Sequence, residues 1–526
     1  MEKAMSGASV MVVSPHALAS AAGARILERG GNAFDAAVAV SACLAVVYPH
    51  MTGVGGDSFW LMYHSQERAV RAYNGSGRSG YGAAIELFAG EASIPVRGIR
   101  SIVTVPGMVD SWDAVLREYG RMRLADVLEP AIAYAEGGFP LSPDQHKDTR
   151  LRRDVLAAEP STARIYLPAR KVPEAGARFV QKELAQTLRQ IALKGRDEFY
   201  KGELAGRIVS FLGERNGLLA AEDFADHAGS WVTPAAGSYR GLDLYQLPPN
   251  SQGFTAIMAA QIIENCDFGG VEHGSYEYYH LLIEALKLSF RDRNRTLTDP
   301  EFADIPLASF LDKSYCRQLY SQIAMDRALT LEPERLGSDT AYAAVVDKDG
   351  NAVSFIQSLY FEFGSGVVAG DTGILLQNRG SYFSLDPGHV NRLEPRKRTF
   401  HTLMPAMALR EGKPYLLYGT QGGEGQPQTQ TALLTRMVDY GMDPQTAINE
   451  PRWVWGRTWG DESQELRLES RIGEKVAARL AQAGHKVRMV GDYDGVVGHA
   501  QAILIDESGF RIGGSDPRCD GAAIGW

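Results

Sequence analysis

The sequence contains few of the residues that disulfide frameworks and zinc centres require. Only four cysteines occur among 526 residues, and no two of them form a CxxC pair. Scattered cysteines are typical of reduced thiols, and they exclude a disulfide-rich extracellular scaffold. The 11 histidines are dispersed as well, with no HExxH motif and no two histidines at i, i+4. We therefore predict no metal site.

Long apolar runs are also missing. No segment approaches the ~20 consecutive apolar residues that a membrane-spanning helix needs. The short run Ala8–Val13 falls below the apolar core of roughly 7–15 residues in a secretory signal. We therefore expect a cytoplasmic protein without a membrane partner.

An excess of positive charge is lacking too. Lys and Arg total 54 against 63 Asp and Glu, which gives a net charge of −9. This balance gives no reason to expect nucleic acid as a partner. The 45% of hydrophobic and 22% of charged residues are ordinary for a folded globular chain, and the length allows a large buried core.

Common catalytic and cofactor motifs are absent or incomplete. The GxSxG elbow of serine hydrolases does not occur, and Gly53–Gly56 lacks the Lys and Ser/Thr of a phosphate loop. Gly75–Gly80 fits GxGxxG, but a dinucleotide site needs an acidic residue about 20 residues later, and that position falls near Arg100. We interpret Gly75–Gly80 as a glycine-rich loop and predict no cofactor.

The first half of the sequence alternates helix-like and strand-like segments. Phe59–Tyr63 and Ala69–Tyr73 predict a hairpin, because a polar turn joins two apolar runs. Asn32 is a suitable N-cap for a helix that reaches about Val47. Helices are also predicted at His16–Arg29, Val109–Arg121, Leu124–Glu136, Leu184–Lys194 and Tyr276–Arg291.

Strand-like segments dominate after about Pro333. Ala341–Asp347 and Ala352–Ser358 flank an Asp-Gly turn, which is a strong hairpin signal. Strands and helices mixed in this way favour layered α+β packing over a βαβ repeat. The polar segment Asp312–Gly337 is expected to be exposed. Further strands are predicted at Gly373–Leu376, Ala406–Leu409, Tyr415–Tyr418 and Gln501–Asp506, with helices at Gln430–Tyr440 and Lys475–Ala483.

Two glycine-containing segments of this half are candidates for chemistry. Gly337–Thr340 lies where a polar stretch meets a strand, and taken alone it indicates only a loop-to-strand junction. Gly419–Gly425 follows the apolar run Tyr415–Tyr418. A glycine pair there can turn backbone N–H groups toward an anion, although a tight strand-to-helix connection needs the same residues.

Several motifs, in order along nearly the whole chain, resemble those of the gamma-glutamyltranspeptidase family, a branch of the N-terminal nucleophile hydrolases. Thr340–Gly350 resembles the nucleophile strand of that family, and Gly513–Arg518 its GASDPR ending. The other matching segments are Gly30–Ala37 (GGNAFDAA), Thr52–Gly56 (TGVGG), Val105–Gly107 (VPG) and Pro248–Ser251 (PPNS).

The resemblance implies a four-layer αββα sandwich and a precursor that cuts itself between Asp339 and Thr340. The products would be a large subunit 1–339 and a small subunit 340–526 that stay associated, and the family also allows a dimer of heterodimers. Thr340 would be the nucleophile, with its new α-amine, of unperturbed pKa ~7.7–8.0, as general base. By position, Ser358 matches a second hydroxyl, and Gly422 and Gly423 match the oxyanion glycines.

The sequence departs from the family where the γ-glutamyl group is held. Without the acidic residue that takes the substrate ammonium, that charge has no evident partner. Arg379 adds a planar cation suited to a carboxylate. Arg78 is a candidate to replace the lost family arginine, and a surface role fits it equally. The differing positions are Gly75 for Arg, Tyr360 for Asn, Arg379 for Gln, Tyr382 for Asp, and His401-Thr402 for a Ser pair.

We therefore predict a self-processing amidohydrolase for a small amide that carries a carboxylate but no α-amine, such as oxamate. The alternative within the family is a γ-glutamyl hydrolase or transpeptidase acting on glutathione-like amides. Two hypotheses from other functional classes are a nucleotide-binding oxidoreductase that uses Gly75–Gly80 and a scaffold protein that is not cut.

Overall fold

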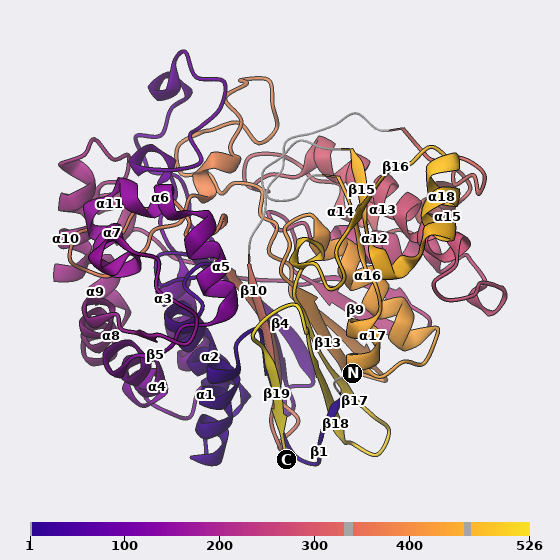
Figure 1. Cartoon of the computed structure of the whole chain (residues 1–526), viewed down its shortest axis with the longest axis horizontal. Coiled ribbons are helices and arrows are strands. Elements are labelled where there is room, and N and C mark those ends of the chain that lie inside the picture. The colour runs from indigo at the N-terminus through magenta and orange to yellow at the C-terminus, as the bar shows by residue number, and fades with distance from the viewer. Residues whose placement is uncertain (1–2, 331–339, 457–463) are drawn as a thin grey trace.

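The computed structural model describes residues 3–330, 340–456 and 464–526. It places two β-sheets face to face between two layers of helices, with helices from the first part of the chain on the left of Figure 1 and most later helices on the right. This arrangement confirms the predicted α+β class and the four-layer αββα sandwich.

Both large sheets are antiparallel, and each has seven strands within the described ranges. Each takes strands from before and after Thr340, so the two parts of the chain are interleaved. Sheet I runs in the order β19 (Ala522–Gly525), β2 (Met11–Ser14), β10 (Ala341–Val346), β11 (Ala352–Ser358), β3 (Asp57–His64), β4 (Ala69–Asn74) and β7 (Ser230–Val232). Sheet II runs in the order β1 (Met5–Gly7), β18 (Arg511–Ser515), β17 (Ala500–Ile505), β13 (Lys413–Thr420), β12 (Ala406–Arg410), β9 (Leu242–Gln246) and β8 (Ala235–Tyr239).

The outer face of sheet I is covered mainly by helices of the first part of the chain. They include α1 (Ala17–Glu28), α2 (Ala33–Val47), α3 (Met108–Tyr119), α4 (Leu124–Gly137) and α8 (Lys182–Lys194). Shorter helices extend this layer: α5 (Pro143–Leu151), α6 (Arg153–Ala158), α7 (Pro160–Tyr166), α9 (Arg196–Tyr200), α10 (Glu203–Gly213) and α11 (Ala221–Ala225).

The outer face of sheet II is covered by helices from both sides of Thr340. They are α12 (Phe254–Ile263), α13 (Tyr276–Thr296), α14 (Leu307–Phe310), α15 (Lys313–Tyr320), α16 (Gly425–Val438), α17 (Pro444–Asn449) and α18 (Glu474–Gln482). A small sheet lies beside them, formed by β14 (Trp453–Trp455), β15 (Glu465–Glu469) and β16 (Lys486–Val490), and a two-stranded ribbon joins β5 (Phe139–Pro140) to β6 (Arg178–Phe179).

Helix α2 begins as its sequence predicts. The Asn32 side chain accepts from the backbone N–H groups of Phe34 and Asp35, and the Asp35 carboxylate accepts from Asn32 N, which completes a capping box. Every residue from Ala33 to Val47 is buried. A helix that is apolar all round is suited to this position, because it packs between sheet I and the outer helices.

The hairpin between β10 and β11 is confirmed. Ala341 pairs with Gln357 and Val346 with Ala352. The Asp347 carboxylate accepts from the backbone N–H of Asp349 at 2.9 Å and of Asn351 at 3.0 Å, which orders the turn. Gly350 has φ +83°, a conformation that glycine adopts without strain.

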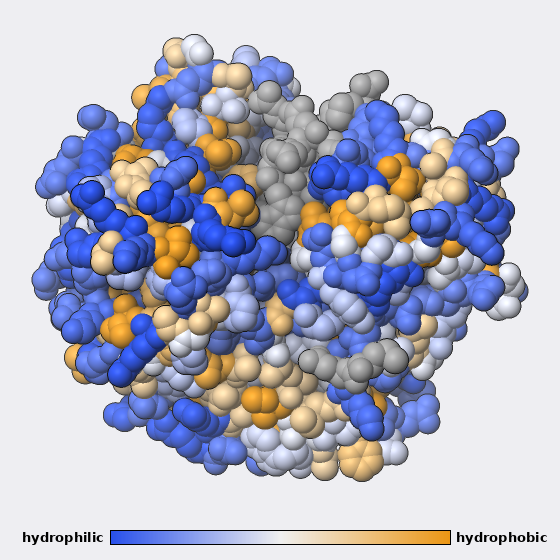
Figure 2. Space-filling model, viewed as in Figure 1, coloured by the Kyte–Doolittle hydropathy of each residue, from blue (hydrophilic) through white to orange (hydrophobic). Residues whose placement is uncertain are grey.

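The segment predicted as exposed, Asp312–Gly337, is largely exposed where the structure describes it, although α15 within it, which Asp312 caps, buries Cys316 and Leu319; residues 331–337 lie outside the described residues. One expectation about the second half was wrong. Gly373–Leu376 forms no strand, and only isolated bridges join Leu375 to Val368 and Leu376 to Gly55. Within the three described ranges no helix is long and apolar enough to cross a bilayer. The face shown in Figure 2 is largely hydrophilic, with small apolar areas.

Candidate active site

The strand register of sheet I brings three polar residues into one row. Ala341 pairs with Gln357, so Thr340, the residue before β10, stands opposite Ser358 at the end of β11. Ser358 in turn pairs with Asp57, the first residue of β3. Opposite residues on neighbouring antiparallel strands have Cβ atoms about 4.5–5.5 Å apart on the same face. Thr340, Ser358 and Asp57 therefore form a row across the end of the sheet.

This row faces the space between the two sheets. Side chains alternate along a strand, and Tyr342, Ile356 and Phe59 belong to the apolar core between the sheets. Thr340, Ser358 and Asp57 have the same parity as these residues and point to the same side. All three are completely buried in the unbroken chain. Asp339, the other half of the predicted cleavage site, lies outside the described residues.

The predicted oxyanion glycines follow the end of β13 and precede α16. Gly422 has φ +123° and Gly423 has φ +51°, both in the region that glycine tolerates best. Successive residues in such conformations turn backbone N–H groups to one side and form an anion-binding concavity. The loop is held from within, because Gly425 N donates to Gly422 O at 2.7 Å.

A glutamine that the sequence did not single out contacts the predicted nucleophile. Gln426, near the start of α16, donates from Nε2 to Thr340 Oγ1 over 3.3 Å. Ser358 Oγ accepts from Tyr360 N at 2.7 Å, which fixes the second hydroxyl of the row. The backbone at Tyr360 is itself unusual, because its φ is +88°. Strain of this kind concentrates at functional sites.

The predicted substrate residues form one buried group around Arg379. The Arg379 guanidinium carbon lies 4.3 Å from the centre of the Tyr360 ring, and the Tyr382 ring lies 5.0 Å from that of Tyr360. Arg379 Nη1 lies 3.5 Å from Thr402 Oγ1. Arg379 Nε and Nη2 are buried and have no hydrogen-bond partner among the described residues. Burial lowers the pKa of Arg379 to about 10, so it stays charged at neutral pH.

His401 connects this group to the row on sheet I. Its Nε2 lies 3.3 Å from Asp57 Oδ2, and its Nδ1 accepts from Leu403 N at 3.4 Å. Burial, reinforced by the charge of Arg379, lowers the pKa of His401 well below its usual value. The ring is therefore neutral, and its proton lies on Nε2 and is donated to Asp57.

Asp57 is the site carboxylate that sequence reasoning missed. Its Oδ1 accepts from Gly107 N at 3.0 Å, Gly77 N at 3.3 Å and Gln377 Nε2 at 3.1 Å. Burial raises the pKa of Asp57 to about 6, although Arg379 and these hydrogen bonds act in the opposite direction. A carboxyl group that titrates near neutral pH beside a buried cation is typical of a functional site.

Gln252 ties the two sides of the candidate site together and was also missed. Its Nε2 donates to Thr402 O at 3.0 Å and to Gly423 O at 2.9 Å. Its Oε1 accepts from Arg293 Nη1 at 2.7 Å, which fixes the orientation of the carboxamide because a guanidinium only donates. Gln252 thus links the predicted substrate residues to the predicted oxyanion loop.

Arg78 and the glycine-rich loop Gly75–Gly80 have other partners. Arg78 Nη1 donates to Asp299 Oδ2 at 3.0 Å and to Arg396 O at 2.9 Å. A Cβ at Gly77 would lie 1.6 Å from Val105 O, and one at Gly75 would lie 1.9 Å from Ser111 Oγ. Close packing against these neighbours explains the glycines without a phosphate ligand.

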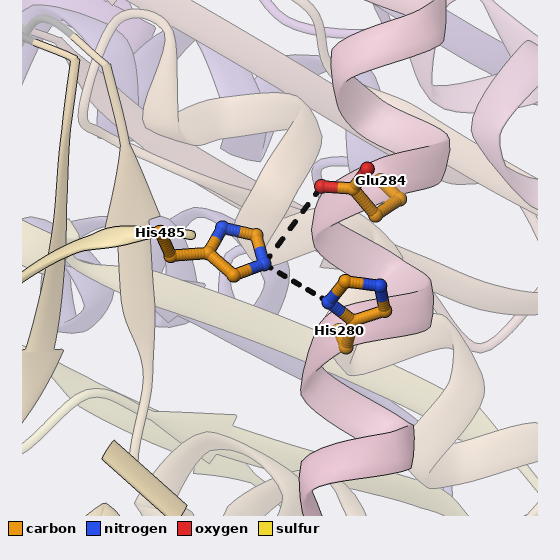
Figure 3. Close-up of side chains that lie close together, drawn as sticks. All are labelled: His280, Glu284 and His485. Carbon is orange, nitrogen blue, oxygen red and sulfur yellow. Dashed lines mark hydrogen bonds and ion pairs between the residues drawn. The ribbon is translucent and has the colours of Figure 1, made fainter. Parts of the chain in front are cut away.

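A second polar cluster lies on the sheet II side of the molecule. Figure 3 shows His280 and Glu284 projecting from one face of α13 toward His485. Their nitrogen and oxygen atoms are close enough to surround a cation. However, Lys287 Nζ already donates to Glu284 Oε1 at 2.8 Å, to Leu329 O at 3.0 Å and to His485 Nδ1 at 3.4 Å.

The remaining hydrogen bonds of this cluster also have protein partners. His280 Nδ1 lies 2.9 Å from His485 Nε2, while His280 Nε2 lies 3.0 Å from Ala324 O. Glu284 Oε2 accepts from Leu329 N at 2.7 Å. An ammonium in contact with the carboxylate and an imidazole repels a metal ion. We interpret the cluster as a hydrogen-bond network that anchors residues 324–329 to α13 and His485.

Replacing Lys287 by methionine tests how much this network contributes to the stability of the fold. The variant leaves the buried Glu284 carboxylate without its cation, and breaking a buried pair in this way costs about 3–5 kcal/mol of the free energy of unfolding. We expect a clear fall in the thermal unfolding midpoint. Lys475→Met on the exposed side of α18 is the matched control and should change it little. Equal midpoints for the two variants would contradict the interpretation.

The chain is similar to known proteins over nearly its whole length. A family model described as gamma-glutamyltranspeptidase matches residues 19–526. The chain is 63% identical over 525 residues to the glutathione hydrolase-like YwrD proenzyme of Bacillus subtilis, with 100% of both chains covered. It is 39% identical to the oxamate amidohydrolase proenzyme of Klebsiella pneumoniae, with 98% of both covered.

A solved structure of a related protein has the same fold. A crystal structure of cephalosporin acylase from Bacillus halodurans superposes with a TM-score of 0.94 at 35% identity, covering 100% of this chain and 97% of that one. The family model, the relatives and the shared fold extend over nearly the whole sequence. The chain therefore belongs to the gamma-glutamyltranspeptidase family.

Proposed function

We propose that this protein is a self-processing amidohydrolase that cleaves a small, carboxylate-bearing amide of the oxamate type through an acyl-enzyme. Thr340 is the nucleophile once the chain is cut before it, which gives subunits 1–339 and 340–526. Strands from both subunits alternate in sheets I and II. Separation of the subunits would break both sheets, so they stay associated after the cut.

The chemistry follows from the groups around Thr340. The free α-amine takes the hydroxyl proton as Oγ1 attacks the substrate carbonyl, and the backbone N–H groups of Gly422 and Gly423 stabilise the oxyanion. Losing one oxyanion donor in other hydrolases costs about 2.7–4 kcal/mol. We expect Ser358, which stands opposite Thr340 in the sheet, to hydrogen-bond the nucleophile. Water then hydrolyses the ester by the same proton route.

Arg379 is the observation that carries the choice of substrate. It is a fully buried cation, and two of its nitrogens, Nε and Nη2, have no hydrogen-bond partner among the described residues. Leaving buried donors unpaired is costly unless a ligand completes them. A carboxylate matches the planar guanidinium in both charge and shape. The Tyr360 ring lies against the guanidinium and the Tyr382 ring lies beside Tyr360, and this bulk favours a small acid over a large one.

A γ-glutamyl substrate is the second candidate, favoured by the relative named as glutathione hydrolase-like. Its α-ammonium would need a carboxylate at the site. Asp57 is the carboxylate of the row, and it already accepts from Gly107 N, Gln377 Nε2 and the His401 ring. An ammonium would have to displace these donors, which favours the oxamate type.

A paired assay separates the two candidates. We expect the processed enzyme to release ammonia from oxamate and to turn over a γ-glutamyl anilide slowly. Rapid hydrolysis of the anilide without ammonia release from oxamate would refute the substrate assignment and leave the amidohydrolase class intact.

The Michaelis constant for a carboxylate substrate should depend on pH through Asp57. Below its pKa of about 6, Asp57 is neutral and does not oppose a second carboxylate near Arg379. Above it, the Asp57 carboxylate repels the substrate carboxylate, so KM should rise with pH by up to about tenfold per pH unit. KM is measured from pH ~5.5 to ~8, and the α-amine of Thr340 affects kcat instead.

Asp57→Asn supplies the control for this pH dependence. Asparagine keeps an oxygen for the backbone donors and cannot ionise, so KM should become nearly constant over the same range. An unchanged slope in this variant would show that another group is responsible.

A further inference from the structure

Gln426 has a donor that is used and an acceptor that is not. The residue is completely buried beside the oxyanion loop, and its backbone N–H donates to Gly423 O at 3.2 Å. Its side-chain Nε2 donates to Thr340 Oγ1 at 3.3 Å. Its Oε1 is buried and has no hydrogen-bond partner among the described residues.

An unpartnered buried carbonyl oxygen next to a nucleophile points to a ligand. Burying such an acceptor without a donor costs free energy, and native proteins rarely leave it so. The oxygen and nitrogen of one carboxamide are about 2.2 Å apart, as their bond lengths to the shared carbon require. Oε1 therefore lies within about 5.5 Å of Thr340 Oγ1, which is within reach of an amide nitrogen on the carbonyl that Oγ1 attacks.

We infer that Gln426 is a further catalytic residue, which holds the nucleophile through Nε2 and accepts an N–H of the scissile amide through Oε1. This inference rests on the proposed function, since it concerns the leaving group of the same reaction. It identifies the preferred leaving group as an amide nitrogen that bears hydrogen, rather than an ester oxygen.

The reaction balances with the groups already named. Thr340 Oγ1 forms a bond to the carbonyl carbon while its proton passes to the α-amine. The carbon–nitrogen bond then breaks, and the leaving nitrogen takes that proton and departs as ammonia. Gln426 Oε1 accepts an N–H throughout, and it orients the nitrogen lone pair toward the protonated amine. The acyl-enzyme is hydrolysed by water to the acid.

Oxamate and monomethyl oxalate form a matched pair for the test. Both deliver the same oxalyl group to Thr340, and only the amide offers an N–H to Gln426. Changes in nucleophile position affect both substrates, so the ratio of their kcat/KM values isolates the contact with Oε1. Intact mass first confirms that each variant has been cut before Thr340.

Three variants distinguish the donor Nε2 of Gln426 from its acceptor Oε1. Gln426→Met removes donor and acceptor, and Gln426→Asn withdraws both by one methylene. Each should lower the amide-to-ester ratio by about 10- to 100-fold, the effect of losing one buried hydrogen bond in the transition state. Gln426→Glu keeps an acceptor oxygen. Its amide-to-ester ratio should therefore stay within about threefold of the wild-type ratio, which is a smaller change than the loss of one hydrogen bond would cause.

An unchanged ratio in both the Met and Asn variants would overturn the inference. If the Met variant stays uncut, the Asn variant decides alone. Failure of the proposed function is distinct, since the wild-type enzyme would then hydrolyse neither oxalyl substrate.

Discussion

Replacing Thr340 by alanine is expected to abolish both self-cleavage and amide hydrolysis. Without Oγ1 there is no atom to attack the preceding carbonyl, so the α-amine that serves as base is never released. Removing the nucleophile of hydrolases that act through an acyl-enzyme lowers kcat by at least about 10⁴-fold. Thr340 is completely buried in the unbroken chain, so the uncut variant should also remain closed to substrate.

Thr340→Ser is the matched control. Serine keeps a hydroxyl at the same place in the row with Ser358 and Asp57, and it should retain both cutting and turnover. Denaturing electrophoresis follows the cut, and ammonia release follows turnover. Residual turnover in Thr340→Ala comparable to the serine variant would show that another residue is the nucleophile.

Arg379→Met is expected to remove recognition of the substrate carboxylate. A buried, hydrogen-bonded charge pair that loses one partner costs about 2–5 kcal/mol, so kcat/KM for oxamate should fall by roughly 30- to several thousand-fold. Oxamide, a neutral molecule of the same shape, should be affected far less. Arg379→Lys should be intermediate, because lysine keeps the charge and loses the planar fork.

For Arg379→Met, the comparison of kcat/KM for oxamate with kcat/KM for oxamide distinguishes a binding role from a structural one. A structural role for Arg379 would lower activity on both substrates equally, because it would disturb Thr340 and the oxyanion loop. Thermal unfolding midpoints for the three proteins separate loss of folding from loss of binding. Equal losses on the charged and neutral amides at an unchanged midpoint would contradict the assignment.

Elements with strong local signals could be predicted from the sequence. Helix α2 begins at its Asn32 cap and ends at Val47, as its capping residues and apolar run predict. The Asp-Gly turn correctly predicted the β10–β11 hairpin. The four-layer sandwich came from the ordered family motifs, because no local pattern specifies which strands from distant segments pair.

The parts that were missed depend on contacts between distant segments. Asp57 reaches the site because β3 pairs with β11 in one particular register. Gln252 joins two segments because its side chain donates to the backbone carbonyls of Thr402 and Gly423. Neither signal exists in a single stretch of sequence. Gly373–Leu376 is apolar enough for a strand but is held by isolated bridges at the sheet end.

The predicted substrate residues are close together in the fold, and this could not be derived from spacing. Arg379, Tyr360, Tyr382 and Thr402 share one buried group, and His401 joins it to Asp57. Arg78 is instead paired with Asp299 at 3.0 Å. The roles of Thr340, Ser358, Gly422 and Gly423 stay predictions from the family resemblance, for which the row and the two glycine conformations supply compatible geometry.

The most direct test of the central claim is the intact mass of the purified protein together with the N-terminal sequence of its fragments. We expect two polypeptides, 1–339 and 340–526, with the smaller one beginning at Thr340. Brief incubation with substrate should add one acyl group to the smaller polypeptide alone. A single uncut chain that hydrolyses amides, or a small fragment that begins at another residue, would contradict the central claim.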